Sequence, residues 1–313
     1  MERPILSARG AAGYLEALDN VLLLTHVRPD GDTIGSAAAL CRALQDCGQT
    51  AYLLPNPEIT ATYAPYAAPY WAPEDWQAEH IVSVDIADAS LLPENAQSYR
   101  DRIELAIDHH PSQTFFARNT CLEADSAACG EIVYEIIQHL TALTADIALP
   151  LYVAVSTDCG GFQYGNTTAR THRIAAALMD VVDVAAVNKT LFRTKSRVRL
   201  AMESRMVADM KLFDHQRVVV MEIPLSLRQE MQATDADIEE LSALPALVEG
   251  TDCGVTLREL RPGTVKVSVR TGPRVDACAL CRILGGGGHH AASGATVEGT
   301  LDEARMALSL IHI

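Results

Sequence analysis

The chain of 313 residues is poor in basic residues. Its 25 Lys and Arg residues stand against 40 Asp and Glu residues, which gives a formal net charge of −15. Proteins that grip long nucleic acids usually carry a basic stripe that displaces counterions from many phosphates. The charge deficit therefore argues against a stable long nucleic-acid partner and favours small substrates.

Long apolar runs, internal repeats and low-complexity segments are also lacking. No apolar run approaches the roughly 18 residues of a membrane span, and the first residues, Met1 to Pro4, do not open a secretory signal. The eight cysteines are scattered along the chain, which favours reduced thiols over a disulfide framework. We expect a cytoplasmic protein with no membrane partner. The apolar run at 307–313 leaves room for a further C-terminal segment.

The chain can bury sizeable cores, since 49% of its residues are hydrophobic, and its length of 313 residues suggests two domains. Short continuous apolar runs at 21–25, 51–54, 81–84 and 103–107 predict buried strands of a parallel sheet. Helices are predicted over 34–47, 131–140 and from about 167 to 182, with N-caps at Ser126 and at Asn166 or Thr167. The proline-rich and aromatic segment 55–76 is interpreted as a packed connection, with a base-stacking surface as the alternative.

The expected fold class is α/β, with an N-terminal parallel-sheet domain (1–185) and a smaller C-terminal α/β domain (211–313). Strands at 218–223, 254–260 and 265–270 and a helix over 275–284 are expected in the second domain. A helical linker (186–210) joins the two domains. The linker region is basic, with Arg193, Lys195, Arg197, Arg199 and Arg205. An interdomain helix and a phosphate-attracting face explain these charges equally well.

Metal-binding side chains follow four apolar runs of the chain. They are His26, Asp30 and Asp32 after 21–24, Asp85 and Asp88 after 81–84, Asp108, His109 and His110 after 103–107, and Asp158 after 151–155. All four runs read as buried strands, and open α/β sheets bind ligands outside the carboxyl ends of their strands. We therefore expect these side chains to converge on one edge of the sheet.

One pocket would then collect six ligands: His26, Asp30, Asp32, Asp85, His109 and Asp158. Imidazole with carboxylates is a ligand set that suits manganese and related divalent ions. Four carboxylates in contact cannot all stay ionised at low cost, but two divalent ions would cancel their charge. Two ions roughly 3.5–4 Å apart activate water and clamp a phosphoryl group. The pattern predicts phosphoester hydrolysis.

The same residues resemble the motifs of the DHH phosphoesterases. The four N-terminal motifs correspond to His26-xxx-Asp30-Gly-Asp32-xx-Gly35-Ser36, Val84-Asp85-xx-Asp88, Asp108-His109-His110 and Thr157-Asp158-x-Gly160. The pattern from Gly285 to Gly294 resembles the glycine-rich motif of the family's associated C-terminal domain. These five ordered motifs span almost the whole chain, and its length is similar to that of the stand-alone branch that acts on short RNA and 3′-phosphoadenosine 5′-phosphate (pAp).

The resemblance implies a division of the ligands between two ions. His26 and Asp30 would hold one ion, Asp32, His109 and Asp158 the other, and Asp85 would bridge them. Asp108 would orient a histidine, and His110 would face the substrate phosphate, so these two are the expected catalytic residues. Two Mn²⁺ ions are the expected cofactors, with Mg²⁺ as the alternative, and a homodimer is considered because members of the family often dimerise.

In the C-terminal domain, the resemblance implies a surface that selects nucleotidyl substrates across a cleft from the metals. The expected substrate-binding residues are Ser268, Arg270, Gly286, Gly287, Gly288 and His289. Glycines allow a backbone to approach a ligand closely and to expose amide donors. Taken alone, the glycine run would indicate only the end of a helix.

Two cysteine hypotheses are set aside. Cys278 and Cys281 with the histidines at 289 and 290 could be written as a zinc site, but a spacing of three on an apolar helix favours buried thiols. Cys129 and Cys159 lie beside functional motifs, yet neither has an activating histidine at a fixed spacing, which argues against nucleophilic cysteine chemistry.

The residues predict a metal-dependent phosphoesterase, and the resemblance implies that it acts on short oligoribonucleotides and pAp. It would release 5′-mononucleotides from the former and AMP from the latter. A phosphodiesterase for linear or cyclic dinucleotides, a pyrophosphatase or polyphosphatase, and a catalytically silent nucleotide-binding module are the alternatives. The intact set of six ligands argues against the silent module.

Overall fold

The computed structural model describes residues 4–288 and 290–309 of the chain. It divides into two compact units, residues 1–194 and residues 195–313. The division falls inside the segment 186–210, where the sequence predicts the connection between domains. Within the described ranges, no helix is long and apolar enough to cross a membrane.

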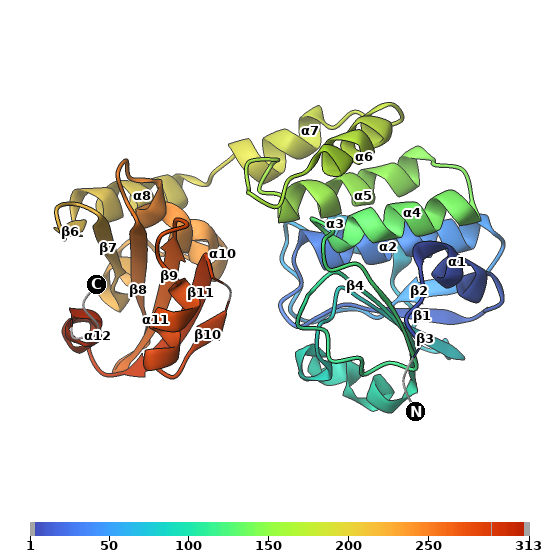
Figure 1. Cartoon of the computed structure of the whole chain (residues 1–313), viewed down its shortest axis with the longest axis horizontal. Coiled ribbons are helices and arrows are strands. Elements are labelled where there is room, and N and C mark those ends of the chain that lie inside the picture. Colours follow the sequence, from blue (N-terminus) through green and yellow to red (C-terminus); the bar gives the residue numbers. More distant parts are fainter. Residues whose placement is uncertain (1–3, 289, 310–313) are drawn as a thin grey trace. The chain divides into compact units, whose positions relative to one another are not determined.

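The first unit is built around a five-stranded parallel sheet (Figure 1). Its strands in spatial order are β2 (Ala51–Leu53), β1 (Val21–Leu24), β3 (His80–Val84), β4 (Ile103–Asp108) and β5 (Asn119–Leu122). The strands predicted at 21–25, 51–54, 81–84 and 103–107 are confirmed, and β5 is an additional edge strand. The chain runs from β1 to β2 on one side of β1 and then crosses to β3 on its other side. Such a reversal of strand order marks where α/β sheets bind ligands.

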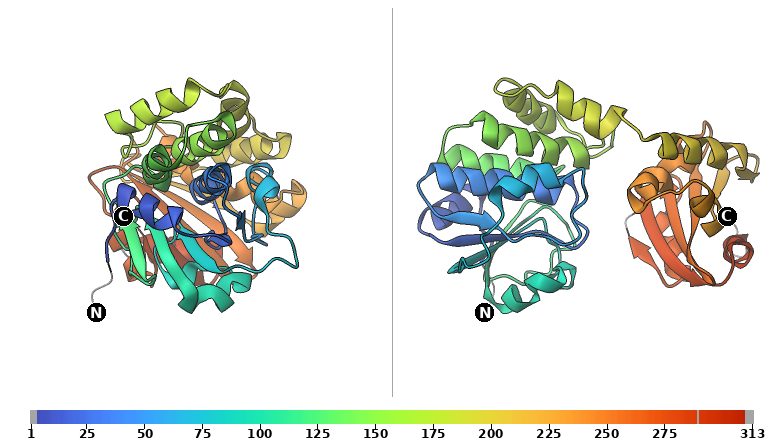
Figure 2. Two further views of the ribbon diagram at one scale, coloured as in Figure 1. Left: turned by 90° about the vertical axis from the view of Figure 1, so that its right-hand side faces the viewer. Right: turned by 180° about the vertical axis from the view of Figure 1, so that it is seen from behind.

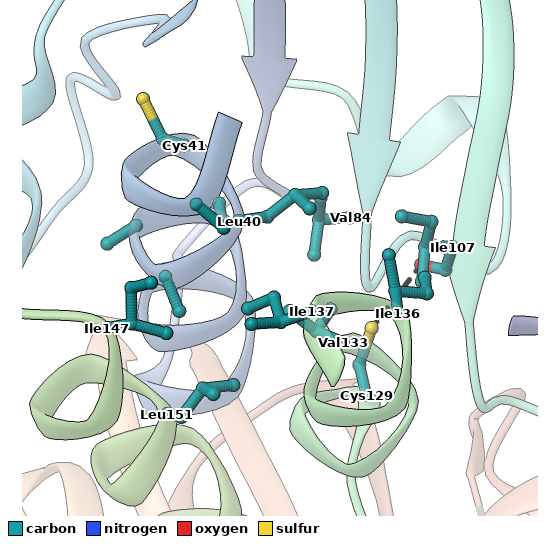
Figure 3. Packing of buried hydrophobic residues seen from close by; sticks show 14 of the residues in the cluster. Leu40, Cys41, Val84, Ile107, Cys129, Val133, Ile136, Ile137, Ile147 and Leu151 are labelled. Atoms are coloured by element: carbon teal, nitrogen blue, oxygen red, sulfur yellow. Dashed lines mark hydrogen bonds between the residues drawn. The ribbon is translucent and has the colours of Figure 1, made fainter. Parts of the chain in front are cut away.

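Alternating residues of these strands face two separate cores. Val21, Leu23, Val82 and Val84 lie in the core shared with α1 (Ala8–Glu16), α2 (Gly31–Asp46) and α4 (Cys129–Leu140). Figure 3 shows Leu40 of α2 and Val133 and Ile136 of α4 packed near Val84 and Ile107 of the sheet. On the other face, Leu22, Leu24 and Ile81 pack with the 3-10 helices Ala89–Leu91 and Glu94–Arg102.

A third layer of helices lies beyond α2 and α4. It consists of α5 (Ala145–Asp158), α6 (Ala169–Met179) and α7 (Ala185–Asn188), followed by a π-helical turn at Lys189–Arg193. Figures 1 and 2 show these helices stacked above α2 and α4, away from the sheet. The segment 55–76 forms α3 (Ala64–Ala67) and a 3-10 turn (Ala68–Tyr70), and several of its aromatic side chains are partly buried against the cores, as expected of a packed connection.

The run 151–155 was expected to be a strand, and this prediction is wrong. The run belongs to the helix α5, whose residues from Ile147 to Ser156 are almost all buried. Because α5 packs against α2, α4 and α6, its apolar side chains surround the helix, and this hides the helical periodicity in the sequence. The approach of α2 is very close, since a Cβ on Gly35 would overlap the carbonyl oxygen of Pro150.

Two predicted helix caps are also wrong. Ala128 precedes the first turn of α4 without a side-chain cap, so Ser126 does not cap this helix. Thr168 caps α6 by accepting a hydrogen bond from the backbone N–H of Thr171, a role expected of Asn166 or Thr167. Both Ser126 and Asn166 instead make contacts close to the predicted metal ligands, as described below.

The second unit contains a six-stranded mixed sheet. Its spatial order is β10 (Gly287–Gly288), β11 (Ala292–Glu298), β9 (Thr264–Thr271), β8 (Cys253–Arg261), β7 (Val218–Ile223) and β6 (Lys211–Phe213). Only β7 and β8 pair in parallel. The three strands predicted here are confirmed, with ends that differ by one residue at most.

Helices cover both faces of this second sheet. Residues of α11 (Ala277–Ile283) and α12 (Leu301–Ser309) share one core with alternate residues of β7, β8 and β9. Cys281 is fully buried in this core, as expected of a structural thiol. The other core includes residues of α8 (Arg197–Ala208), α9 (Leu225–Glu230), α10 (Asp235–Ile238) and the 3-10 helix Glu239–Leu247.

Several basic residues of α8, and Lys195 just before it, are paired with acidic residues. Lys195 and Arg199 lie 2.8 and 3.2 Å from Glu203, and Arg205 lies 2.8 Å from Asp209. Met202 and Met206 of the same helix are buried against the second sheet. These contacts favour a structural explanation of the basic pattern over a phosphate-attracting face.

Candidate metal centre

Five of the six predicted metal ligands follow strands β1, β3 and β4 or begin the helix after β1. His26 lies two residues after β1, Asp30 caps α2, and Asp32 is in the first turn of α2. Asp85 directly follows β3, and His109 directly follows β4. Asp85 has a φ of 60°, a left-handed conformation that is uncommon for a residue with a Cβ and is often found at functional sites.

The sixth predicted ligand, Asp158, comes from the end of α5 and not from a strand. It nevertheless reaches the same place, because its Oδ2 atom lies 3.7 Å from Nε2 of His109. The close packing of α5 on α2 brings this helix end to the edge of the sheet. The positions of all six side chains therefore agree with the expected convergence, although one of the supporting elements was assigned wrongly.

The six side chains form two groups that share a carboxylate. In the first group, Nε2 of His26 lies 3.6 Å from Oδ1 of Asp30 and 3.7 Å from Oδ2 of Asp85. In the second group, Nε2 of His109 lies 3.8 Å from Oδ2 of Asp32 and 3.7 Å from Oδ2 of Asp158. Asp85 joins the groups, since its Oδ1 lies 3.6 Å from Nε2 of His109.

Hydrogen bonds orient the two histidine rings. Nδ1 of His26 donates to the carbonyl oxygen of Val27 at 2.8 Å, and Nδ1 of His109 donates to the carbonyl oxygen of Ser126 at 3.1 Å. A carbonyl can only accept, so Nδ1 carries the proton in both rings, and Nε2, which points to the carboxylates, is the atom that would bind an ion. Metal-binding histidines are held in this way.

Backbone amides hold the carboxylates of Asp30 and Asp32. Asp30 accepts hydrogen bonds from the N–H groups of Asp32 and Thr33, which is an N-cap geometry. Asp32 accepts from the N–H groups of Cys129 at 2.7 Å and Gly130 at 2.9 Å, at the start of α4. These hydrogen bonds orient both carboxylates, which lowers the cost of forming a metal centre.

Burial and mutual repulsion give the carboxylates unusual proton affinities. Burial, and then the neighbouring Asp32, raise the pKa of Asp85 well above its usual value. Burial and neighbouring carboxylates raise the pKa of Asp32 and of Asp158 to about 7. Oδ1 of Asp85 is buried and accepts no hydrogen bond. A pair of divalent cations would supply the missing partner and cancel the repulsion, so the residues fit the two ions that the motifs imply.

Asp108 and His110 form a hydrogen-bonded pair beside these groups, with Nδ1 of His110 3.6 Å from Oδ1 of Asp85. Nδ1 of His110 donates to Oδ1 of Asp108 at 2.7 Å, and Nε2 of Gln113 donates to Oδ2 of Asp108 at 2.7 Å. Asp108 is fully buried, whereas His110 is partly exposed. The hydrogen bond that His110 donates to Asp108, opposed by burial, raises the pKa of His110. Sequence reasoning missed Gln113, and no motif marks it.

The two cysteines beside the site are unsuited to nucleophilic chemistry. Burial raises the pKa of Cys159 to about 12 and that of Cys129 well above its usual value. A thiol with a raised pKa stays protonated at neutral pH and is a weak nucleophile. This agrees with the expectation that neither cysteine acts as a nucleophile.

A cavity of about 350 Å³ lies in the second unit, and four of the predicted substrate-binding residues line it: Ser268, Arg270, Gly287 and Gly288. Gly286 supports the loop, because a Cβ there would overlap the carbonyl oxygen of Gly294. The sixth predicted substrate-binding residue, His289, lies outside the described residues.

The same cavity contains residues that sequence reasoning missed. Thr256, Arg258 and Lys266 line it together with Ser268 and Arg270. A signal for them was available: in β9, Lys266, Ser268 and Arg270 alternate with the buried Val265, Val267 and Val269. Alternation of this kind places the polar residues on one face of the strand.

Comparisons with known proteins agree with these observations. Residues 20–155 match the DHH family, N-terminal domain. The chain is 32% identical over 303 residues, 95% of its length and 90% of the relative, to the bifunctional oligoribonuclease and PAP phosphatase NrnA of Thermus thermophilus. The crystal structure of an exopolyphosphatase-related protein from Bacteroides fragilis has a TM-score of 0.87 at 21% identity and covers 97% of this chain and 95% of its own.

A more distant fold likeness is found in the exonuclease RecJ bound to manganese. Its TM-score is 0.52 at 12% identity, with 98% of this chain and 94% of the other covered. The extent of the sequence match to the Thermus thermophilus protein, together with the match to the N-terminal domain, decides the family. The chain belongs to the DHH family of phosphoesterases.

Proposed function

We propose that this chain is a two-metal phosphoesterase that hydrolyses short oligoribonucleotides to 5′-mononucleotides and pAp to AMP. The observation that carries the proposal is the position of Asp85, which presents one carboxylate oxygen to each of the two ligand groups. The relative in Thermus thermophilus, whose name gives both activities, aligns over 95% of the chain.

The proposed ligands are His26 and Asp30 for one ion, Asp32, His109 and Asp158 for the other, and Asp85 for both. Bound divalent ions would neutralise phosphate charge and make a water molecule nucleophilic. Mn²⁺ is the preferred candidate because the donors are mostly carboxylate oxygens with two imidazoles, and Mg²⁺ is the alternative.

Asp108 and His110 supply the proton chemistry of the proposed site. Asp108 holds the proton on Nδ1 of His110 and favours the charged ring. Nε2 of His110 is then a donor for a phosphate oxygen of the substrate or for the oxygen that leaves. The catalytic role of Asp108 is to position His110, and Gln113 in turn positions Asp108.

The cavity of the second unit is proposed to select nucleotidyl substrates. It concentrates Arg258, Lys266 and Arg270 in a chain whose net charge is −15. Ser268 and the loop at Gly287 and Gly288 add polar groups suited to a phosphate or a base. A small cavity of this kind fits short nucleotides, and the acidic surface as a whole disfavours long polymers.

One substrate panel tests the proposal. It contains pAp, di- to pentaribonucleotides, a 24-mer, linear and cyclic dinucleotides and pyrophosphate, each with Mn²⁺, Mg²⁺, Zn²⁺ or chelator. We expect release of AMP from pAp and of 5′-mononucleotides from the short RNAs, loss of activity on chelation, and better recovery with Mn²⁺ than with Zn²⁺. Turnover that persists after verified metal removal would exclude the mechanism, and binding without turnover would indicate a silent module.

A cytoplasmic location and a homodimer remain predictions. Eight free cysteines, seven of them buried, suit a reducing compartment. Size-exclusion chromatography with light scattering would decide the oligomeric state.

A further inference from the structure

The segment 123–131, which runs from the end of β5 through the first turn of α4, holds two of the proposed ligands through its backbone. The carbonyl oxygen of Ser126 accepts from His109, and the N–H groups of Cys129 and Gly130 donate to Asp32. Both ligands belong to the group that includes Asp158. The position of residues 123–131 therefore affects this group, while the backbone groups that orient His26 and Asp30 lie elsewhere, at residues 27, 32 and 33.

Arg170 of α6 contacts several side chains of this segment. Its Nη1 donates to Oε2 of Glu123 at 2.9 Å and to Oγ of Ser126 at 3.1 Å. Its Nη2 lies 2.7 Å from Oε1 of Glu135, and its Nε lies 3.8 Å from Oε2 of Glu131. One guanidinium thus contacts both ends of the segment and the following turn of α4.

Glu131 makes this arrangement sensitive to the charge of Arg170. Its side chain is only 1% exposed, and it accepts hydrogen bonds from the N–H of Ala127 at 3.3 Å and from Oγ1 of Thr171 at 2.5 Å. A buried carboxylate is stable only with a partner charge and hydrogen bonds. Without Arg170, three carboxylates would repel one another around the segment that holds Asp32 and His109.

Asn166 connects the same segment to the third ligand of the group. Its Nδ2 donates to the carbonyl oxygens of Ala127 at 2.9 Å and of Asp158 at 3.1 Å. The segment before α4 and the end of α5 are therefore held together by one amide. Ser126, expected as a helix cap, and Asn166, expected as another, both serve this arrangement.

We propose that Arg170, with Asn166, is a positioning residue for the Asp32, His109 and Asp158 group and sets the affinity of that group for a divalent ion. The inference rests on the proposed metal centre. It predicts a selective effect, because the His26, Asp30 and Asp85 group makes no contact with Arg170 or Asn166 among the hydrogen bonds and ion pairs of the described residues.

The test is Mn²⁺ titration of the chelator-treated full chain by isothermal calorimetry. Arg170→Gln keeps a polar side chain but removes the charge, and Arg173→Gln makes the same change at an exposed position of the same helix. We expect Arg170→Gln to weaken one of two binding events by about 10- to 100-fold and to leave the other within about twofold, the size of effect typical for groups that orient metal ligands. Arg173→Gln should bind both ions with the affinities of the unsubstituted chain. Arg170→Lys, which restores the positive charge, should recover part of the affinity lost in Arg170→Gln.

Asn166→Ala keeps the test decisive if Arg170→Gln does not fold, since it leaves the guanidinium and its three carboxylates in place. It should also weaken one event selectively, with an unchanged circular dichroism spectrum. Equal weakening of both events, or no weakening, in folded variants would overturn the positioning role while the metal centre stands. An unchanged chain that binds no divalent ion would instead refute the metal centre itself.

Discussion

Oδ1 of Asp85 lies 3.6 Å from Nε2 of His109 and is buried without a hydrogen-bond partner. The other oxygen of the same carboxylate faces His26 at 3.7 Å. A buried carboxylate oxygen without a donor is costly unless a cation completes its surroundings. The relationship between Asp85 and the two histidines thus explains why one side chain matters to both ligand groups.

Replacing this carboxylate by an amide should therefore cost more than the same change nearby. We expect Asp85→Asn to lose more than about 100-fold in activity and to retain fewer than two ions, because a bridging ligand supports both. Asp88→Asn is the matched control: Asp88 caps a 3-10 helix by accepting from the N–H of Ser90, and asparagine caps equally well. Normal turnover and two bound metals in folded Asp85→Asn would disprove the bridging role.

Stability without metal should fall as the pH rises from about 4 to 7. Asp32 and Asp158 have a pKa of about 7 in the folded chain, because of burial and neighbouring carboxylates, against an ordinary 3.8. The folded protein then binds more protons than the unfolded protein in this range, so the free energy of unfolding decreases with pH. Mn²⁺ should reverse the trend above pH 6, since the ionised forms are the ligands.

Thermal unfolding between about pH 4 and 7, with chelator and with Mn²⁺, measures this dependence. Asp158→Asn provides the control: because an amide does not titrate and Asp32 remains, the slope in chelator should become shallower. If the melting temperature of the chelated protein increased over this interval, the assigned directions of the carboxylate pKa values would be wrong.

The sequence predicted the sheet well because its strands are buried on both faces and appear as continuous apolar runs. Since these strands are parallel, residues that follow β1, β3 and β4 had to meet at one edge. Asp158 reached the correct place on an incorrect element, because α5 is buried on all sides and resembles a buried strand in composition. Apolar runs alone do not distinguish the two.

Other parts of the site could not be found from residue types. The carbonyl of Ser126 and the amides of Cys129 and Gly130 are backbone groups, so their role depends on tertiary position and not on side-chain identity. Arg170 is ordinary in the sequence and acquires a role only where α6 meets the segment before α4. The polar face of β9 was accessible to sequence reasoning through its alternation.

Removal of Arg270 should weaken substrate binding without affecting the metals. Arg270 lines the cavity of the second unit, and a hydrogen bond to a charged group contributes roughly 1.5–3 kcal/mol. Arg270→Ala should therefore lose about 10- to 100-fold in kcat/KM for pAp and short RNA. Arg282→Ala, at an exposed position outside the cavity lining, is the control.

The comparison with a small substrate separates binding from chemistry. Bis-p-nitrophenyl phosphate lacks the nucleotide that the cavity is proposed to hold, so its hydrolysis by Arg270→Ala should change much less. Metal content should stay at the value of the unchanged chain. Equal losses on both types of substrate, or loss of metal, would show that the cavity is not the specificity element.

The glycine loop offers a paired test of shape against flexibility. A Cβ at Gly286 would overlap the carbonyl oxygen of Gly294 and lie 2.6 Å from Cβ of Ala295, whereas a Cβ at Gly287 meets nothing within 4 Å. Gly286→Ala should destabilise the second unit by about 1–3 kcal/mol, the usual cost of forcing atoms into a filled space. Gly287→Ala should fold normally and affect only ligands that enter the cavity.

Spectroscopy can assign this destabilisation to one unit, because both tryptophans of the chain, Trp71 and Trp76, lie in the first unit. In urea, Gly286→Ala should shift a transition seen by circular dichroism and leave the tryptophan fluorescence transition in place. Coincident shifts of both signals would mean that the units unfold together. The cost of Gly286→Ala would then be measured as the loss in the free energy of unfolding of the whole chain. Equal costs for Gly286→Ala and Gly287→Ala would contradict the close approach of β11 as the reason for a glycine at position 286.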